Sequence, residues 1–298
     1  MTATPSRRSL LYAPADDTAI LESAFDSEAD GVVCELEDGV DGAAKADARD
    51  NVECVVPGLS SPDTEVCVRI NSLKSDCWMT DLDAALAAGV DTVVLPKVDY
   101  GHEVRTLASV VRQLTTEAER PDVIVALERP RGVFYGREIA EVCAEIDVVT
   151  AAYQGYADYC EYTGASSTND EIRHFLNRLL VGYAGLAGIE PIAPADVRVE
   201  DADRVRAFAE RCSEMGYDGQ LALHPAQVEV LNDVYSPSRS EYEQARHLVS
   251  TYRESEAGSM VVDGVFLDRP VVNRYVDTVR QYEAIHDIEP TVEYDFLE

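Results

Sequence analysis

Apolar, β-rich runs recur eight times along the chain, and each ends on a charged or otherwise chemically capable residue. They predict eight strands, at Ser9–Pro14, Gly31–Asp38, Glu65–Asn71, Thr92–Lys97, Asp122–Glu128, Asp147–Tyr153, Gly188–Ile192 and Gly219–Pro225. Amphipathic stretches that predict helices lie between them, at Thr18–Glu28, Asp81–Ala88, His102–Glu119, Gly136–Glu145, Glu171–Ala187 and Asp201–Met215. Strands and helices that alternate across short connections are typical of βα units, so we predict an α/β fold, a (β/α)8 TIM barrel.

The chain continues beyond the eighth predicted strand. Its last part predicts a helix over Ser240–Glu256, a hairpin over Ser259–Leu267 that turns at Asp263-Gly264, and a final helix over Pro270–Ile285. We therefore predict a barrel over residues 1–235 and a C-terminal extension over residues 236–298. The extension could pack on a neighbouring subunit and reach over that subunit's barrel mouth, or it could cap the helices of its own barrel.

The residues that end the runs predict where an active site lies. In a TIM barrel the C-terminal ends of the strands converge on one face, so side chains far apart in sequence meet there. The candidates are Glu37, Asp38, Arg69, Lys97, Glu128, Asp158 and His224.

Glu128 and Asp158 are predicted to end strands five and six, which are neighbours in the barrel. Such strands lie about 4.8 Å apart, so the two carboxylates could share one cation. Oxygen ligands without nearby His or Cys favour Mg²⁺, with positions left for substrate and water. Alternatively, either acid could cap a helix or pair with Arg131 or Arg137.

Three further run-end residues each have two interpretations. Arg69 follows an apolar stretch, and its planar fork suits the carboxylate of an α-keto acid, but it could equally form a salt bridge with Glu37 or Asp38. Lys97 could neutralise an anionic substrate or pair with the same acids. His224 could be a general base, although a histidine held by backbone hydrogen bonds before Pro225 is the more ordinary role.

The charge balance restricts the partners. The chain has 56 acidic and 25 basic residues and a formal net charge of -31, which disfavours nucleic acid and anionic membrane surfaces. Acids are spread over every predicted helix and lysine is rare, so we expect a surface adapted to high salt, from a halophilic and archaeal host. No run approaches the ~20 apolar residues of a membrane span, and the apolar stretch after Arg7 and Arg8 is too short for a signal peptide, so we expect a cytoplasmic protein.

Eight short motifs follow one another from Arg8 to about Tyr275. They are Arg8-Ser-Leu-Leu-Tyr-Ala-Pro; Glu35-Leu-Glu-Asp-Gly-Val with Lys45 and Arg49; Val68-Arg-Ile-Asn; Leu95-Pro-Lys-Val; Glu128 with Arg131-Gly132; Gly155-Tyr-Ala-Asp158 with Gly164; Asp218-Gly-Gln-Leu-Ala-Leu-His-Pro-Ala-Gln; and Gly264 with Asp268 and Pro270. In this order the chain resembles the citrate lyase β-subunit-like and malyl-CoA lyase family, within the HpcH/HpaI aldolase superfamily.

The resemblance implies a set of roles. It implies a Mg²⁺-dependent barrel, with Mn²⁺ as a substitute, that cleaves or forms a carbon–carbon bond between an acyl-CoA and an α-keto acid. By resemblance, Glu128 and Asp158 hold the metal and Arg69 anchors the carboxylate. Glu37 and Asp38 fix water and Arg69, Arg8 lies near the thioester carrier, and Asp268 of a neighbouring subunit exchanges a proton with the thioester enolate. A homo-oligomer, a trimer or hexamer, follows.

The sequence departs from the family pattern at a few positions. Glu35 and Arg129-Pro130 stand where Asp and Thr or Ser are commoner, Gln220 replaces a lysine, and the segment around Pro191–Arg198 is lengthened. These changes concern the thioester carrier and the substrate, not the metal pair. We therefore expect a carbon–carbon lyase that acts on a malyl-CoA-type thioester. The alternatives are a thioesterase at the same site and the β subunit of a citrate lyase complex.

Overall fold

A computed structural model of the chain describes residues 7–59, 61, 63–199, 201–255 and 258–290. The chain divides into two compact units, with a boundary between Asp233 and Val234. The boundary expected from the sequence lies two residues further along the chain. Residues 1–6, Glu256 and residues 291–298, which the predicted elements and domains include, lie outside the described residues.

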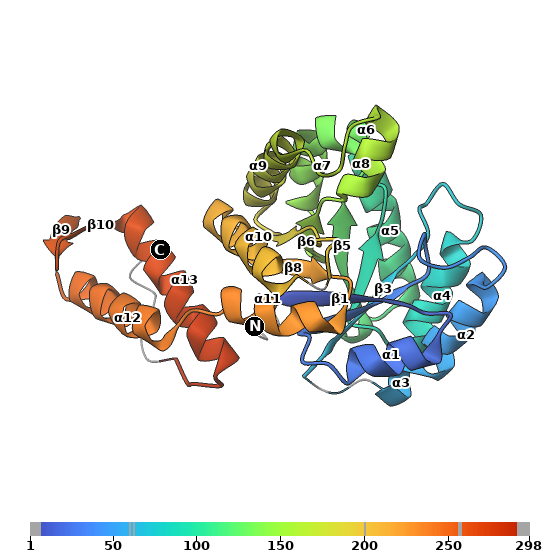
Figure 1. Cartoon of the computed structure of the whole chain (residues 1–298), viewed down its shortest axis with the longest axis horizontal. Helices are drawn as coiled ribbons and strands as arrows, with labels where there is room; N and C mark the ends of the chain where they lie inside the picture. The colour runs from blue at the N-terminus through green and yellow to red at the C-terminus, as the bar shows by residue number, and fades with distance from the viewer. Residues whose placement is uncertain (1–6, 60, 62, 200, 256–257, 291–298) are drawn as a thin grey trace. The chain divides into compact units, whose positions relative to one another are not determined.

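Eight parallel strands close into a barrel in the first unit, each paired with the next and β8 with β1 (Figure 1). The strands are β1 (Ser9–Pro14), β2 (Gly31–Glu35), β3 (Glu65–Arg69), β4 (Thr92–Leu95), β5 (Asp122–Ala126), β6 (Val149–Tyr153), β7 (Glu190–Ala193) and β8 (Gly219–Ala222). The helices are α1 (Thr18–Phe25), α2 (Lys45–Cys54), α3 (Val56–Leu59), α4 (Trp78–Ala88), α5 (Gly101–Leu114), α6 (Pro130–Phe134), α7 (Gly136–Cys143), α8 (Tyr156–Thr163), α9 (Asp170–Ala187), α10 (Ala202–Met215) and α11 (Val228–Val234). The predicted TIM barrel is confirmed.

Several strands end earlier than the apolar runs predict. β2 ends at Glu35, whereas the pattern predicts a strand as far as Asp38. β4 ends at Leu95, and Lys97 has a φ of 54°, in the left-handed region where a strand cannot continue. The residues after the strands thus form loops at the C-terminal rim of the barrel, where their side chains can turn towards its mouth.

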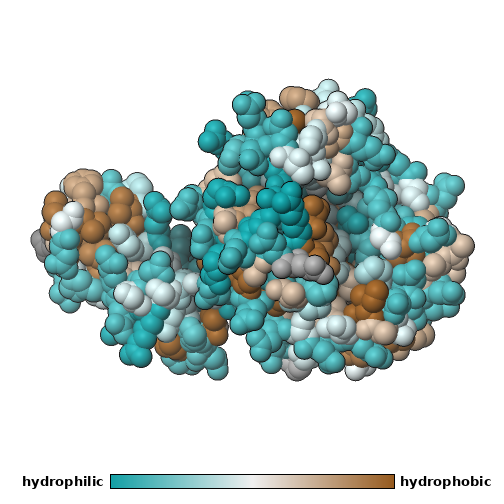
Figure 2. Space-filling view, in the orientation of Figure 1, coloured by the Kyte–Doolittle hydropathy of each residue, from teal (hydrophilic) through white to brown (hydrophobic). Residues whose placement is uncertain are grey.

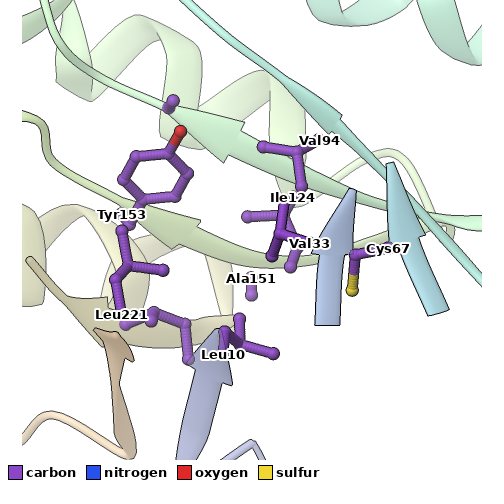
Figure 3. Packing of buried hydrophobic residues seen from close by; sticks show 10 residues of the cluster. Leu10, Val33, Cys67, Val94, Ile124, Ala151, Tyr153 and Leu221 are labelled. Carbon is purple, nitrogen blue, oxygen red and sulfur yellow. The ribbon is translucent and has the colours of Figure 1, made fainter. Parts of the chain in front are cut away.

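Inward-facing side chains fill the barrel. Figure 3 shows Leu10, Val33, Cys67, Val94, Ile124, Ala151, Tyr153 and Leu221 packed between the strands. All of them are buried, and the cluster draws on every strand of the barrel. A filled interior means that chemistry must take place at the ends of the strands and not in a central channel.

Arg7 closes the end of the barrel where the strands begin. Its guanidinium is buried and donates to both carboxylate oxygens of Glu65 at 2.8 Å. It also contacts Glu190 at 3.0 Å, Thr150 at 3.0 Å and Asp122 at 3.5 Å. One side chain from the N-terminus thereby joins the starts of β3, β5, β6 and β7.

The second unit consists of two helices and a hairpin. Helix α12 (Arg239–Arg253) starts with a capping box formed by Ser238 and Glu241. Strands β9 (Ser259–Val262) and β10 (Val265–Asp268) turn through Asp263 and Gly264, both at positive φ. Helix α13 (Arg269–Ile285) packs on α12 and the hairpin through a small apolar core. The predicted helix–hairpin–helix order is observed.

Hydrophilic residues cover most of the face shown in Figure 2. In the described part of the chain, no helix combines the length and apolar character needed to cross a membrane.

Candidate active site

The C-terminal rim of the barrel brings most of the predicted residues together. Glu37 and Asp38 follow β2, Arg69 ends β3, Lys97 follows β4, and Glu128 follows β5. Asp158 lies in the first turn of α8, which follows β6. These six side chains form one network of ion pairs.

Arg69 is held from several sides. Its Nε donates a short hydrogen bond to Glu35, and its guanidinium carbon lies 4.9 Å above the ring of Tyr12. Its Nη1 lies 3.7 Å from Glu37 Oε2 and 3.8 Å from Glu128 Oε2. The expected ion-pair partner was Glu37 or Asp38, but the shortest contact is to Glu35, a residue singled out only as a departure from the family pattern. Glu35 also accepts the backbone N–H of Glu37 and so links the end of β2 to Arg69.

Lys97 lies among three carboxylates. Its Nζ is 2.5 Å from Asp38 Oδ2, 2.9 Å from Glu37 Oε1 and 3.6 Å from Asp158 Oδ1. Burial lowers the pKa of Lys97, but the hydrogen bonds to Asp38 and Glu37 outweigh it and leave the pKa above its ordinary value. Of the two interpretations of Lys97, pairing with these acids is therefore the one observed.

Glu128 is a buried carboxyl group in a crowded position. Burial, together with the nearby charges of Asp158 and Glu37, raises its pKa to about 8 although Arg69 opposes the shift. Its Oε1 accepts the backbone N–H of Lys97 at 3.0 Å. A methyl group on Gly155 would come within 2.6 Å of Glu128 Oε2, so this glycine leaves the carboxylate its place.

The site holds more acid than base, and this fits a divalent cation. Five carboxyl groups face two basic side chains, Arg69 and Lys97. Glu37 Oε2 is buried without a hydrogen-bond partner, and burial raises the Glu37 pKa. Among the described residues, no group of three or more His, Cys, Asp or Glu is arranged around one metal position. A cation here would therefore rely on few protein oxygens and on water or substrate.

The alternative partners of Glu128 and Asp158 are occupied elsewhere. Arg131 donates to the Tyr100 hydroxyl at 2.9 Å, and Arg137 pairs with Glu141 at 2.9 Å. Asp158 does lie in the first turn of a helix, where a negative charge is favourable. This position at the start of a helix is compatible with metal binding, because the helix dipole acts on the charge of Asp158 and leaves its oxygen atoms available to a cation.

A second layer of polar contacts fixes the ends of β2 and β3. Lys45 Nζ donates to the carbonyl oxygens of Leu36 and Glu37 at 2.7 and 2.6 Å and to Asn71 Oδ1 at 3.0 Å. Asn71 donates in turn to Asp81 at 2.7 Å. Lys45 had no predicted role, although its rarity as one of three lysines was a signal.

Arg8 lies away from these residues, and its predicted place near the thioester carrier stays a prediction. It precedes β1 at the opposite end of the barrel, and its guanidinium donates to Asp30 at 2.6 and 2.9 Å. The motif that contains Arg8 begins at the start of a strand, and the start of a strand lies away from the C-terminal rim.

Two other residues have structural contacts. His224 is exposed, and its Nδ1 accepts the backbone N–H of Ala226 at 3.1 Å, which supports its structural interpretation. Asp268 ends β10 in the second unit, where its side chain accepts the N–H of Val271 at 3.1 Å and caps α13. Its predicted role in a neighbouring active site stays a prediction.

Comparison with known proteins then decides the family. The pattern of the HpcH/HpaI aldolase/citrate lyase family matches residues 8–225, which span the whole barrel. The chain belongs to the HpcH/HpaI aldolase/citrate lyase family. The resemblance found in the motifs is confirmed, and the chain is an enzyme of a lyase family.

Three relatives of this family are informative. A citrate lyase subunit beta-like protein of Deinococcus radiodurans is 31% identical, over 95% of this chain and 100% of that protein. A (3S)-malyl-CoA thioesterase of Cereibacter sphaeroides is 28% identical, over 92% of each. A citrate lyase beta subunit from Mycobacterium tuberculosis, solved with oxaloacetate and magnesium, is 26% identical, with a TM-score of 0.65 over 78% of this chain and 98% of that one.

Proposed function

We propose that the chain is a Mg²⁺-dependent carbon–carbon lyase that acts on a malyl-CoA-type 3-hydroxyacyl thioester. The products of cleavage would be an acyl-CoA and an α-keto acid. In the condensing direction the same two compounds would be the substrates. The observation that carries this proposal is the orientation of Arg69. Its Nε is tied to Glu35, while Nη1 makes only longer contacts and is available to a substrate carboxylate.

The metal assignment rests on Glu128 and Asp158. Both lie at the rim, and the surplus of carboxylates favours a bound divalent cation. The Mycobacterium tuberculosis relative was solved with magnesium and oxaloacetate, an α-keto acid. A magnesium ion would supply Lewis-acid polarisation of the substrate oxygen, and Mn²⁺ could replace it.

The side chains of this chain would bind and orient the substrate. Arg69 would hold the carboxylate next to the bond that breaks, and Lys97 would hold the side chains of Glu37 and Asp38 in place. Cleavage would release the hydroxyl proton to solvent and leave an enolate on the thioester, and a proton must then reach the enolate carbon. We assign that proton to Asp268 of a neighbouring subunit. A Schiff-base lysine is not needed, since Lys97 is already engaged by carboxylates.

A thioesterase is the second candidate, because the Cereibacter sphaeroides relative carries that name. In that case water would attack the thioester at the same site. A citrate lyase β subunit is the third, since relatives carry that name as well. A carrier protein with an acidic surface would be repelled by a chain of net charge -31, and this favours free CoA.

Product analysis separates the first two functions. Purified protein is incubated with malyl-CoA or citramalyl-CoA and Mg²⁺. Glyoxylate or pyruvate with an acyl-CoA indicates the lyase, and a free hydroxy acid with CoA indicates the thioesterase. Glu128→Ala and Asp158→Ala, and treatment with EDTA, are expected to abolish turnover. Full activity in any of these three would contradict the metal assignment, and turnover of neither thioester would contradict both functions.

The shared active site is tested by mixing inactive chains. Asp268→Asn removes the acid but keeps a side-chain oxygen that can cap α13, so this variant is expected to fold. If Asp268 acts in a neighbouring subunit of a trimer or hexamer, its mixture with Glu128→Ala chains regains activity, because some interfaces then hold an intact set. Subunit exchange shown by mass spectrometry without regained activity would mean that Asp268 does not act across subunits.

A further inference from the structure

A small cavity lies between α9 and α10, outside the barrel. Its volume is about 210 Å³, and it is lined by residues of these two helices alone: Asp170, Arg173, His174, Asn177, Phe208, Arg211 and Met215. None of these belongs to the candidate active site. The volume is below the ~300–1,000 Å³ of sites for drug-sized ligands, so a ligand of this cavity must be small.

Arg173 is the residue that distinguishes this cavity. It is only 6% exposed, and its Nε is buried without a hydrogen-bond partner. No carboxylate of the described residues forms an ion pair with its guanidinium. Arg7, the other buried arginine among the described residues, and Arg69, which is half-buried, each have a glutamate partner within 3 Å. A buried charge without a counter-charge is costly, so its retention in a chain rich in acids needs a reason.

Two aromatic rings position Arg173 without neutralising it. Its guanidinium carbon lies 5.1 Å from the centre of the Tyr156 ring and 5.4 Å from that of Phe208. These contacts stabilise a cation, but they leave its N–H donors free for an acceptor. Tyr156 is itself held by Asn177, which lines the same cavity. The guanidinium is therefore fixed in orientation before any ligand arrives.

The other charged lining residues favour an anion. Arg211 is exposed and adds a second guanidinium, His174 can add a further donor, and Asp170 is the one carboxylate of the lining. We propose that this cavity binds a small oxyanion, a phosphate or a carboxylate, between Arg173 and Arg211. Both groups present oxygen pairs that match a planar guanidinium fork. This proposal is independent of the reaction at the barrel mouth.

Calorimetric titration and thermal unfolding test the proposal. Inorganic phosphate and malonate are each titrated at one ionic strength set with KCl, because any salt is expected to stabilise so acidic a chain. We expect phosphate or malonate to bind saturably, with one site per chain. The anion that binds shows whether the ligand is a phosphate or a carboxylate. No saturable response to either overturns the proposal.

Variants assign the binding to the cavity. Arg211→Gln is exposed and should fold, and we expect it to weaken binding about tenfold by removing one charged hydrogen bond. Arg178→Gln removes the same charge from the exposed side of α9, does not line this cavity, and should leave the affinity unchanged. Equal weakening by both would indicate diffuse electrostatic attraction and would overturn the site.

Arg173→Met separates a ligand-binding role from a structural one. If Arg173 serves a ligand, this variant loses oxyanion binding and, without oxyanion, has a higher Tm than the wild type, because an unpaired buried charge is gone. If Arg173 stabilises the fold instead, the Tm of Arg173→Met is lower than that of the wild type, and oxyanion does not stabilise the wild type. Should the variant fail to fold, Arg211→Gln and its control decide the question.

Discussion

Arg69 shows how the position of one guanidinium depends on its neighbours. Glu35 holds its Nε, and the Tyr12 ring lies under it. We expect Arg69→Lys to lower kcat/KM about a hundredfold, because a point charge replaces the planar guanidinium that Glu35 and Tyr12 orient. Steady-state kinetics on the thioester measures this. Arg49→Lys, which changes a residue paired with Asp81 instead, is the control. A near-normal kcat/KM for Arg69→Lys would place the carboxylate anchor elsewhere.

Glu190, at the opposite end of the barrel, gives a pH-dependent prediction. Burial raises its pKa from 4.5 to about 7, although Arg7 opposes the shift. The folded chain thus keeps this proton at a pH where the unfolded chain has lost it. The stability that the protonated group contributes is complete below pH 4.5 and is lost as the pH rises to 7.

Glu190→Gln keeps the neutral form at every pH. We expect it to raise the free energy of unfolding by about 1–2 kcal/mol at pH 8 and to change it little at pH 5. Urea unfolding at the two values measures the difference. Glu65→Gln is the contrasting variant, because it removes the bidentate partner of Arg7. It should lower the free energy of unfolding at both pH values. Destabilisation by Glu190→Gln at pH 8 would contradict the assignment.

The sequence predicted which residues reach the rim and which acids Lys97 pairs with, but not the main partner of Arg69. Strand ends identified Glu37, Arg69 and Glu128, because the barrel topology alone brings such positions together. The contact between Arg69 and Glu35 depends on which way a side chain points at the last residue of a strand, and that is set by tertiary register. Arg7 and Arg8 illustrate the same limit: adjacent identical residues face different surroundings, and only the fold shows which one is buried.

At the scale of the elements, the strands were predictable, but their ends and the helices α2, α3, α6, α8 and α11 were not. The apolar runs that predicted β2 and β4 continue into buried loop residues such as Leu36 and Pro96, so hydrophobicity did not mark where hydrogen bonding stops. Helix α2 was missed because only Ala48 and Val52 of its residues are buried, which leaves little periodic signal. In the barrel core the buried residues lie in strands, whereas at the rim buried residues also lie in loops.

The junction of β6 and α8 gives a prediction about metal binding. Gly155 has ordinary backbone angles, so Ala can adopt them, but its methyl group would press on Glu128 Oε2. We expect Gly155→Ala to weaken Mg²⁺ binding about tenfold and to lower the Tm only slightly, as measured by calorimetry.

Gly185→Ala is the matched control for this change. Gly185 lies inside α9 with no atom within 4 Å of the added methyl group, so the variant should be more stable by about 0.5–1 kcal/mol and bind Mg²⁺ normally. An unchanged Mg²⁺ affinity in Gly155→Ala would argue that Glu128 is not a ligand.

At the scale of the whole molecule, the net charge of -31 predicts that stability depends on salt. Exposed ion pairs such as Arg105–Glu145 and Arg206–Asp233 use few of the acids. We expect the Tm to rise between 0.1 and 2 M KCl, because salt screens the remaining repulsion, as in a protein from a halophilic host. Sucrose at matched osmolality controls for general exclusion effects. A Tm that stays constant over this range would contradict adaptation to salt.

The contacts of Arg7 also constrain how the chain can be made. Arg7 leaves the ribosome before its partner Glu190, which lies 183 residues later in the chain. Until then its charge has no complete set of acceptors, and β1 lacks β8, its last neighbour. A nascent chain that stops before β7 must keep the start of its first strand in water. Burial of the Arg7 charge and closure of the barrel therefore both come late in synthesis.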